Sequence, residues 1–145
     1  MKLRFVILTS LMLTTSNIYA QTVEKCDIEI VLFAKNKMGQ LSQKGVSNFL
    51  LTFGQECQNN VEYSEFSNEV LFDLLDKQTE LVLKTMEKEE KKIELNVILE
   101  DLGTPINDGI DVKTILTKVE KIKMRGELKD KIVGRLKSAI KNMNN

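Results

Sequence analysis

A single proline, Pro105, occurs in this chain of 145 residues, and its seven glycines are spread singly along the sequence. Proline and glycine are the residues that most strongly interrupt helices. Lys, Glu and Leu, which favour helices, are abundant by contrast. The sequence therefore predicts a chain that folds mainly into helices.

Two apolar stripes at helical spacing predict helices in the C-terminal part of the chain. The first follows Asp111, a residue type suited to a helix N-cap, and comprises Val112, Ile115, Leu116, Val119 and Ile122. The second comprises Leu128, Ile132, Val133, Leu136, Ile140 and Met143. Gly126 separates the two stripes and suits a tight connection between helices.

Three further stripes predict helices in the middle of the chain. The strongest comprises Phe66, Val70, Leu71, Leu74 and Leu75, and we expect Ser64 to cap it. The second comprises Leu81, Val82 and Met86. The third comprises Leu95, Ile98, Leu99 and Leu102 and ends at residues 103–105. Residues 107–109, Asn-Asp-Gly, are typical of a turn.

The N-terminal third is more ambiguous. One helix is predicted by Val46, Phe49, Leu50 and Phe53, with Gly54 at its end. Residues 28–34 (IEIVLFA) form a nearly continuous apolar run, and periodicity does not distinguish a buried helix from a strand there. We favour a helix because no second strand is predicted to pair with this run. The expected fold is all-α: a single domain of about seven short helices, either an irregular bundle or a short HEAT-like stack of helical hairpins.

The first 20 residues have the order of a secretory signal peptide. Lys2 and Arg4 give a basic start, residues 5–13 form a compact apolar run, and a polar segment ends on the small Ala20. The apolar run is too short for a membrane span, which needs about 20 apolar residues. No Cys lies at the cleavage point to carry a lipid. We expect cleavage between Ala20 and Gln21, which leaves residues 21–145 as a periplasmic or secreted domain without a stable membrane anchor.

The chain has two cysteines, Cys26 and Cys57. In an oxidising compartment an isolated pair most simply forms one structural disulfide. A redox-active pair is the alternative, but it usually needs a Cys-x-x-Cys spacing or a basic neighbourhood that lowers the thiol pKa. Cys26 precedes Asp27 and Cys57 follows Glu56, so we favour the structural disulfide.

The composition argues against several functions. The mature chain would carry 19 basic and 21 acidic residues, which is too nearly neutral for a general nucleic-acid binder. There is no histidine, so Ser–His and Cys–His nucleophile pairs and most zinc sites are excluded. Neighbouring carboxylates such as Glu100 and Asp101 point in different directions on a helix and are typical of solvated surface. Residues 107–111 lack the further ligands of a calcium loop and predict a turn followed by a helix cap. We expect no catalytic residues, no cofactor and no metal.

Charge is distributed unevenly along the chain. Residues 56–111 contain 15 acidic and 5 basic residues, whereas residues 112–145 contain 10 basic and 3 acidic residues. One interpretation is that the basic C-terminal helix packs beside the acidic middle helices and offsets their charge. The other is that an acidic face stays exposed and attracts a cationic partner protein. The candidate partner-binding residues are Glu65, Glu69, Asp73 and Asp76.

Residues 60–72, NVEYSEFSNEVLF, resemble small exported helical proteins of the Bacteroidota type, as do the Ala20–Gln21 cleavage point and the Lys- and Asn-rich composition. The resemblance extends loosely over most of the mature chain and implies no catalytic residues. Exported helical proteins of this kind include immunity factors that block a toxin in the periplasm. The resemblance therefore suggests an immunity-type inhibitor.

The sequence as a whole predicts an exported, non-catalytic helical module that binds another protein. The alternative is a small-molecule or lipid carrier with an apolar cavity between its helices. In that case the cavity would be lined by Phe49, Phe53, Phe66 and Phe72.

Overall fold

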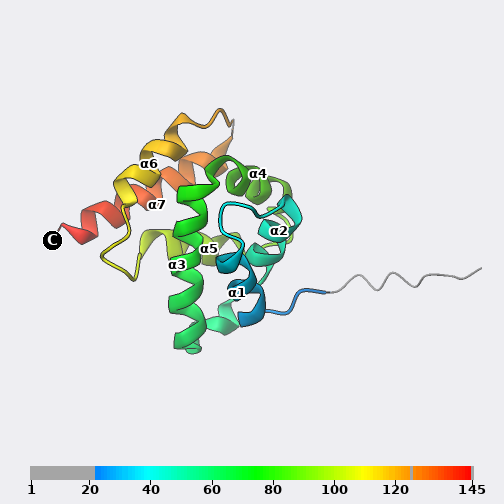
Figure 1. The fold of residues 1–145 in the computed structure, drawn as a ribbon. Coiled ribbons are helices and arrows are strands. Elements are labelled where there is room, and N and C mark those ends of the chain that lie inside the picture. Colours follow the sequence, from blue (N-terminus) through cyan, green and yellow to red (C-terminus); the bar gives the residue numbers. More distant parts are fainter. Residues whose placement is uncertain (1–21, 125, 145) are drawn as a thin grey trace, which may run out of the picture.

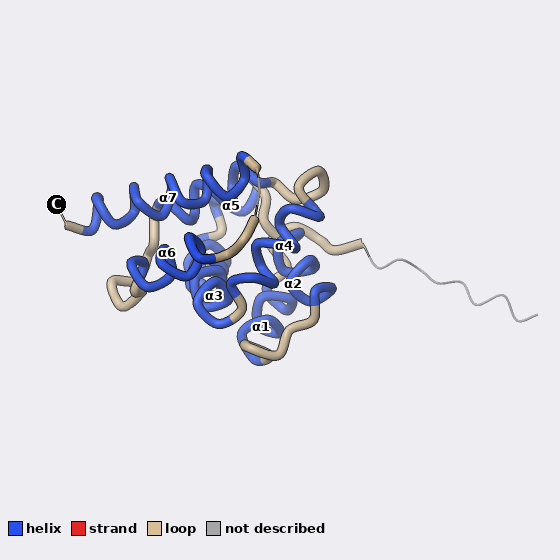
Figure 2. The backbone as a smooth tube through the Cα atoms, turned by 90° about the horizontal axis from the view of Figure 1, so that it is seen from above, coloured by secondary structure: helices blue, strands red, loops and turns tan. Residues whose placement is uncertain are grey.

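The computed structural model describes residues 22–124 and 126–144, which form seven α-helices and one 3-10 helix and contain no strand (Figures 1 and 2). In chain order these are α1 (Ile28–Asn36), α2 (Gln43–Leu51), the 3-10 helix η1 (Gln55–Asn59), α3 (Val61–Lys77), α4 (Thr79–Glu89), α5 (Leu95–Gly103), α6 (Val112–Lys121) and α7 (Glu127–Met143). The predicted all-α class is confirmed. The predicted signal peptide and its cleavage point lie outside the described residues.

The ambiguous run at residues 28–34 is the helix α1. Asp27 caps it, because its Oδ1 atom accepts hydrogen bonds from the backbone N–H groups of Glu29, at 3.0 Å, and Ile30, at 3.3 Å. Only Val31 and Ala34 of this helix are fully buried. The strand alternative is therefore wrong, and an apolar run on so short a helix leaves some large side chains facing outward.

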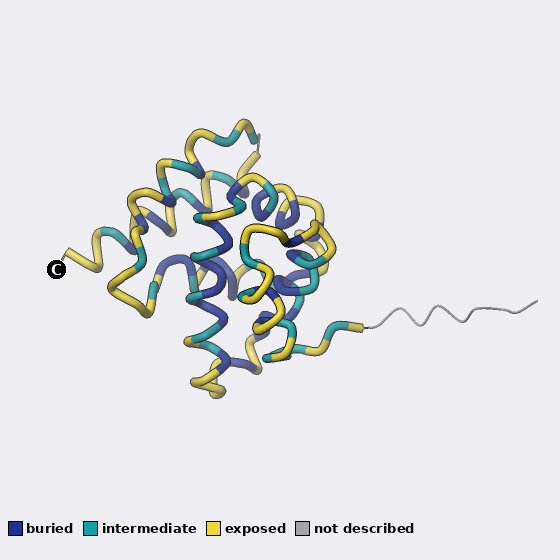
Figure 3. Tube along the Cα trace, viewed as in Figure 1, coloured by how far each residue is buried: buried dark blue, intermediate teal, exposed yellow. Residues whose placement is uncertain are grey.

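Helix α3 forms the axis of the bundle (Figures 1 and 3). It packs against α1, α4, α5, α6 and η1, which come from both ends of the described chain. Its buried face contains Tyr63, Ser67, Asn68, Val70, Leu71, Phe72, Leu74 and Leu75. Because helices that precede and follow α3 in the chain both pack on it, the fold is an irregular bundle rather than a one-dimensional stack of hairpins.

The expected cap of α3 at Ser64 is wrong. The helix begins one turn earlier, at Val61, and Asn60 caps it by accepting a hydrogen bond from the backbone N–H of Tyr63 at 3.2 Å. Tyr63 is buried, which adds an apolar anchor upstream of the predicted stripe. The Ser64 hydroxyl instead donates to the Cys57 carbonyl at 3.0 Å and joins α3 to η1.

The two C-terminal helices form as predicted. Asp111 caps α6, and its Oδ1 atom accepts a hydrogen bond from the backbone N–H of Thr114 at 3.0 Å. Gly126 has φ 118°, a conformation that glycine adopts far more readily than other residues, and it lets the chain turn back into α7. Helix α7 then packs against α5 and α6, with Leu128, Ile132 and Leu136 buried. None of the helices in residues 22–124 and 126–144 has the length and apolar character of a membrane span.

The predicted disulfide is present between Cys26 and Cys57, whose Cα atoms are 5.5 Å apart. It joins the residue before the N-cap of α1 to η1. The backbone N–H of Cys26 also donates to the Thr52 carbonyl at 2.8 Å, so the same segment is held to the end of α2. The start of α1 is thus fixed to two elements that follow it in the chain.

We expect the Cys26→Ala/Cys57→Ala variant of the mature chain to lose about 3 kcal/mol of unfolding free energy. The disulfide closes a loop of about 32 residues and thereby raises the free energy of the unfolded state by roughly 3.5 kcal/mol. Urea denaturation followed by circular dichroism measures this loss. Reduction of the wild-type protein should produce a similar loss and leave the variant unchanged. A loss below about 1 kcal/mol would show that the disulfide contributes little to stability.

Candidate functional site

Two of the exposed large apolar side chains, Leu32 and Ile106, border the same hollow on the surface. The exposed large apolar residues of the described chain are Leu32, Phe33, Val61, Ile106 and Met143. The first four lie on α1, at the start of α3 and in the α5–α6 loop, which spans residues 104–111. Figure 1 shows α1 and the α5–α6 loop on either side of α3. Clusters of exposed apolar side chains with a polar border are typical of interaction sites.

A groove of about 810 Å³ lies among these three elements. Its apolar surface is formed by Ile28 and Leu32 of α1, Phe66 of α3, and Ile106 of the loop. Its acidic residues are Glu62, Glu65 and Glu69 of α3 and Asp108 of the loop, and Asn107 completes the lining. We call this feature the acidic groove. It is open to solvent along its length.

The spacing of residues on α3 explains why the groove is both acidic and apolar. Glu62, Glu65, Phe66 and Glu69 are separated by three, one and three residues, which places them on one face of the helix. The opposite face supplies the buried residues of the core. Helix α3 is therefore amphipathic along its first half, and its outward face forms the floor of the groove.

Asn68 holds the loop that forms one wall of the groove. Its side chain is buried, and its Nδ2 atom donates to the carbonyl groups of Asp101, at 3.1 Å, and Thr104, at 3.3 Å. Its Oδ1 atom accepts a hydrogen bond from the backbone N–H of Ile106 at 3.2 Å. One buried amide thus caps the end of α5 and fixes the backbone at Ile106.

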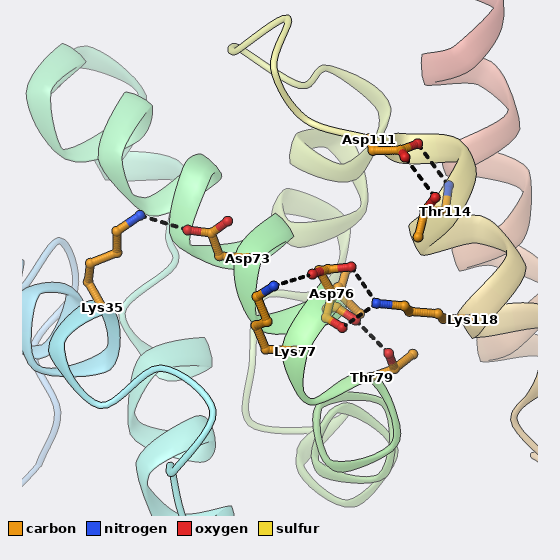
Figure 4. A network of polar contacts seen from close by, with 9 residues as sticks. Lys35, Asp73, Asp76, Lys77, Thr79, Asp111, Thr114 and Lys118 are labelled. Atoms are coloured by element: carbon orange, nitrogen blue, oxygen red, sulfur yellow. Dashed lines mark hydrogen bonds and ion pairs between the residues drawn. The ribbon is translucent and has the colours of Figure 1, made fainter.

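The turn that follows is stabilised locally, as the sequence predicts. The Asn107 Oδ1 atom accepts a hydrogen bond from the backbone N–H of Gly109 at 2.8 Å. Asp111 accepts hydrogen bonds from both the backbone and the hydroxyl of Thr114, and these bonds lower the pKa of Asp111 (Figure 4). The oxygen side chains at 107 and 111 are therefore engaged by their own backbone segment.

Glu65 and Glu69, two of the predicted partner-binding residues, line the acidic groove. Glu69 and Asp73 both accept hydrogen bonds from the Lys35 ammonium group of α1 at 2.7 Å. Hydrogen bonds to Asp73 and Glu69 raise the pKa of Lys35. Asp73 thus joins α3 to α1, and Figure 4 shows its pair with Lys35.

Asp76 serves as a contact between α3 and α6. Lys118 of α6 donates to the Asp76 carboxylate and also to the Asp76 backbone carbonyl, at 2.9 Å (Figure 4). Lys77 forms a second ion pair with the same carboxylate at 3.0 Å. These hydrogen bonds, that of Lys118 above all, lower the pKa of Asp76. Around Asp76, therefore, basic residues offset the charge of the acidic middle helices.

The charge of the acidic groove is left largely uncompensated. No ion pair joins Glu62, Glu65 or Asp108 to a basic residue within residues 22–124 and 126–144, and all three side chains are exposed. The sequence does not predict Glu62, Asp108, Leu32 or Ile106 as partner-binding residues. One signal was present for Leu32, since a continuous apolar run on a helix must expose part of itself.

The carboxylates Glu100 and Asp101 differ in their surroundings. Burial raises the pKa of Asp101 to about 6, and the nearby charge of Glu100 adds to the effect. Asp101 borders a hollow of about 40 Å³ that also includes Tyr63 and Cys57. Burial likewise raises the pKa of Tyr63 to about 12. The hollow is large enough for about one water molecule, whose share of liquid volume is about 30 Å³, and too small for a substrate.

Three of the four phenylalanines that a carrier would use fill the core. Phe49, Phe53 and Phe72 are almost completely buried, and the rings of Phe49 and Phe53 pack edge to face with centroids 5.2 Å apart. Phe66 alone of the four borders the acidic groove. In the part of the chain that the structure describes, no cluster of three or more Cys, Asp or Glu side chains is arranged to hold a metal ion.

Comparisons with protein-family models, with curated proteins and with solved structures gave no match. The groove and the residues around it are therefore the only indication of function within the described part of the chain.

We expect Asn68→Ala to lower the free energy of unfolding by about 2–3 kcal/mol, because it leaves buried backbone groups at the end of α5 without partners. Urea denaturation of the mature protein measures the loss, and hydrogen exchange should show lower protection of the Ile106 amide. Asn107→Ala, which removes one exposed hydrogen bond, is the control and should cost less than about 1 kcal/mol. Equal effects of the two substitutions would contradict the role assigned to Asn68.

We expect Asp101→Asn to stabilise the protein by about 1–2 kcal/mol at pH 7.5 and by nearly nothing at pH 3.5. In the folded state the pKa of Asp101 is about 6, against an ordinary value of 3.8, so ionisation opposes folding. The penalty is absent below about pH 4, grows between pH 4 and 6, and is complete above pH 6. Because the carboxyl group retains some contact with water, the expected gain is smaller than the full free-energy difference that these two pKa values imply.

Urea denaturation of both proteins across this pH range measures the difference. Glu100→Gln is the control: Glu100 is exposed, so its replacement should stabilise the protein less at pH 7.5. A gain from Asp101→Asn that is independent of pH would contradict the assigned pKa.

Proposed function

We propose that this chain is an exported, non-catalytic module that binds another protein through the acidic groove. The observation that carries this proposal is the exposure of Leu32 and Ile106, both lining the groove, beside carboxylates that have no ion-pair partner in the described chain. Large apolar side chains exposed together cost free energy in water, and that cost is recovered when a partner covers them.

The groove has the anatomy of a protein-binding site. Apolar side chains from α1, α3 and the loop lie next to acidic side chains in the groove, and surfaces that combine apolar and polar groups are typical of protein interfaces. Phe33 borders a different hollow, which lies beside Gly45 and Asn48 of α2, so it is not part of this surface.

Electrostatics supports a cationic partner. Glu62, Glu65 and Asp108 lie close together on elements of one groove. Uncompensated carboxylates of this kind attract a basic surface and raise the rate of association, and they disfavour acidic partners. The most specific form of the proposal is that this chain is an immunity-type inhibitor. It would cover a basic functional surface of another exported protein.

A pull-down with the mature chain as bait tests the proposal. We expect the wild-type chain to retain a stoichiometric partner from an extract of exported proteins, identified by mass spectrometry. Ile106→Ser should reduce recovery of that partner at least fivefold, since loss of a central apolar contact commonly costs more than 1 kcal/mol of binding free energy. Leu32→Ser should have a similar effect.

Met143→Ser is the matched control, because Met143 is also exposed but is not among the residues that line the groove. It should leave recovery unchanged. Recovery of no stoichiometric partner under several conditions, or a partner that all three variants retain equally, would overturn the proposal.

A further inference from the structure

We propose that the segment recognised by the acidic groove is a basic amphipathic helix of the partner protein; this inference rests on the proposed function. Its apolar side chains would contact Leu32, Phe66 and Ile106, and its Lys or Arg side chains would face Glu62, Glu65 and Asp108. Three features of the groove lead to this occupant: its length, its backbone surroundings and the distribution of its unpaired charge.

The groove is long enough for a helix. A second hollow, of about 410 Å³, continues along α3 and shares Glu69 and Asn107 with the acidic groove. Together they follow α3 from Glu62 to Lys77. A helix rises 1.5 Å per residue, so this distance is about 22 Å and matches a partner helix of roughly 14 residues. Figure 3 shows the exposed and partly exposed residues along this side of α3.

The surroundings favour a helix over an extended peptide. An extended peptide usually gains affinity by pairing its backbone with the edge of a sheet, and residues 22–124 and 126–144 contain no strand. A helix satisfies its own backbone hydrogen bonds and needs only side-chain contacts. The apolar and acidic side chains that line the groove provide such contacts.

The acidic side chains without an ion pair lie in the acidic groove and not in the second hollow that continues it. Glu62, Glu65 and Asp108 have no ion pair in the described chain, whereas Asp73 and Asp76 in the second hollow are neutralised by Lys35, Lys77 and Lys118. The basic residues of the partner helix should therefore be concentrated over its part that faces Glu62 and Glu65. The part that faces Asp73 and Asp76 should be less charged.

A second copy of this chain does not fit the site. Its basic helix α7 already buries Leu128, Ile132 and Leu136 in its own core, so it has no free apolar face to insert. Figure 2 shows α7 and α1 on opposite sides of the molecule. If α7 of one copy bound the groove of another, the groove of the first copy and α7 of the second would stay free. Further copies would then add at both ends and form an open chain of molecules. The occupant is therefore a helix of a different protein.

The test uses a fluorescent 14-residue peptide of Leu and Lys, with Leu at positions that form one helical face. Fluorescence anisotropy should show saturable binding to the mature chain, and circular dichroism should show a gain of peptide helicity. A peptide with Lys replaced by Glu should not bind. A peptide of the same composition but without the helical pattern should bind at least tenfold more weakly.

Matched charge reversals locate the binding site. Glu62→Lys/Glu65→Lys should weaken binding at least tenfold. Glu87→Lys/Glu90→Lys, which has the same three-residue spacing and changes net charge equally on exposed positions of α4 and its end, should change it less than twofold. Because lysine in the first turn of α3 opposes the helix dipole, Glu62→Gln/Glu65→Gln provides a milder variant that should still weaken binding at least threefold.

Several outcomes would overturn the inference. An equal loss of peptide binding in both charge-reversed variants would show that the peptide responds only to the net charge of the protein. Equally strong binding of the peptide without a helical pattern would show that no helix is recognised. Self-association of the wild-type chain that Glu62→Lys/Glu65→Lys abolishes, measured by analytical ultracentrifugation, would assign the groove to a second copy. If no patterned peptide binds while Ile106→Ser still abolishes the pull-down, the proposed function stands and the helical occupant is wrong.

Discussion

The structure depends on the burial of α3. Of the six residues from Val70 to Leu75 in its C-terminal half, all but Asp73 are completely buried, so most of the surface of this half packs against the rest of the fold. Apolar burial of this kind is the dominant favourable contribution to folding. The N-terminal half of α3 is covered only on its inner face, where Tyr63, Ser67 and Asn68 lie. The same helix therefore supplies the core at one end and the floor of an open groove at the other.

The acidic residues of α3 also differ between its two halves, because those in the buried half form ion pairs with other helices. Towards the buried end, Asp73 and Asp76 meet lysines from α1 and α6 and help to hold these helices in place. Partly buried carboxylates of this kind require partners, because an unpaired charge loses its hydration without compensation. At the open end, Glu62 and Glu65 remain hydrated and need no partner within the fold. The structural role and the proposed partner-binding role thus separate along a single helix.

The sequence predicts the helices well because their signals are local. Apolar stripes at helical spacing and the cap at Asp111 depend only on neighbouring residues, and the corresponding helices form where expected. The start of α3 was misplaced because two capping residue types, Asn60 and Ser64, lie one turn apart, and the choice depends on the burial of Tyr63.

Tertiary contacts explain what the sequence does not predict. Glu65 and Asp76 look equivalent in the sequence, yet Asp76 is paired with Lys118, which is 42 residues away. Asn68 resembles any polar residue of a helix, and its role at the α5–α6 loop depends on the packing of α3 against α5. The candidate site is therefore predicted only in part: its acidic character follows from composition, whereas its position and apolar contacts require the fold.

The disulfide links the proposed export of the chain to the proposed site. Helix α1 forms one wall of the groove, but it has only nine residues and buries only two of them completely, so apolar burial holds it weakly. Its N-terminal end is fixed by the bond between Cys26 and Cys57, and its C-terminal end by the pairs of Lys35 with Glu69 and Asp73. Without the disulfide, partly exposed ion pairs would provide much of the attachment, and such pairs contribute little on their own. An oxidising compartment is therefore the environment in which Leu32 is held in position beside Phe66 and the groove has a defined shape.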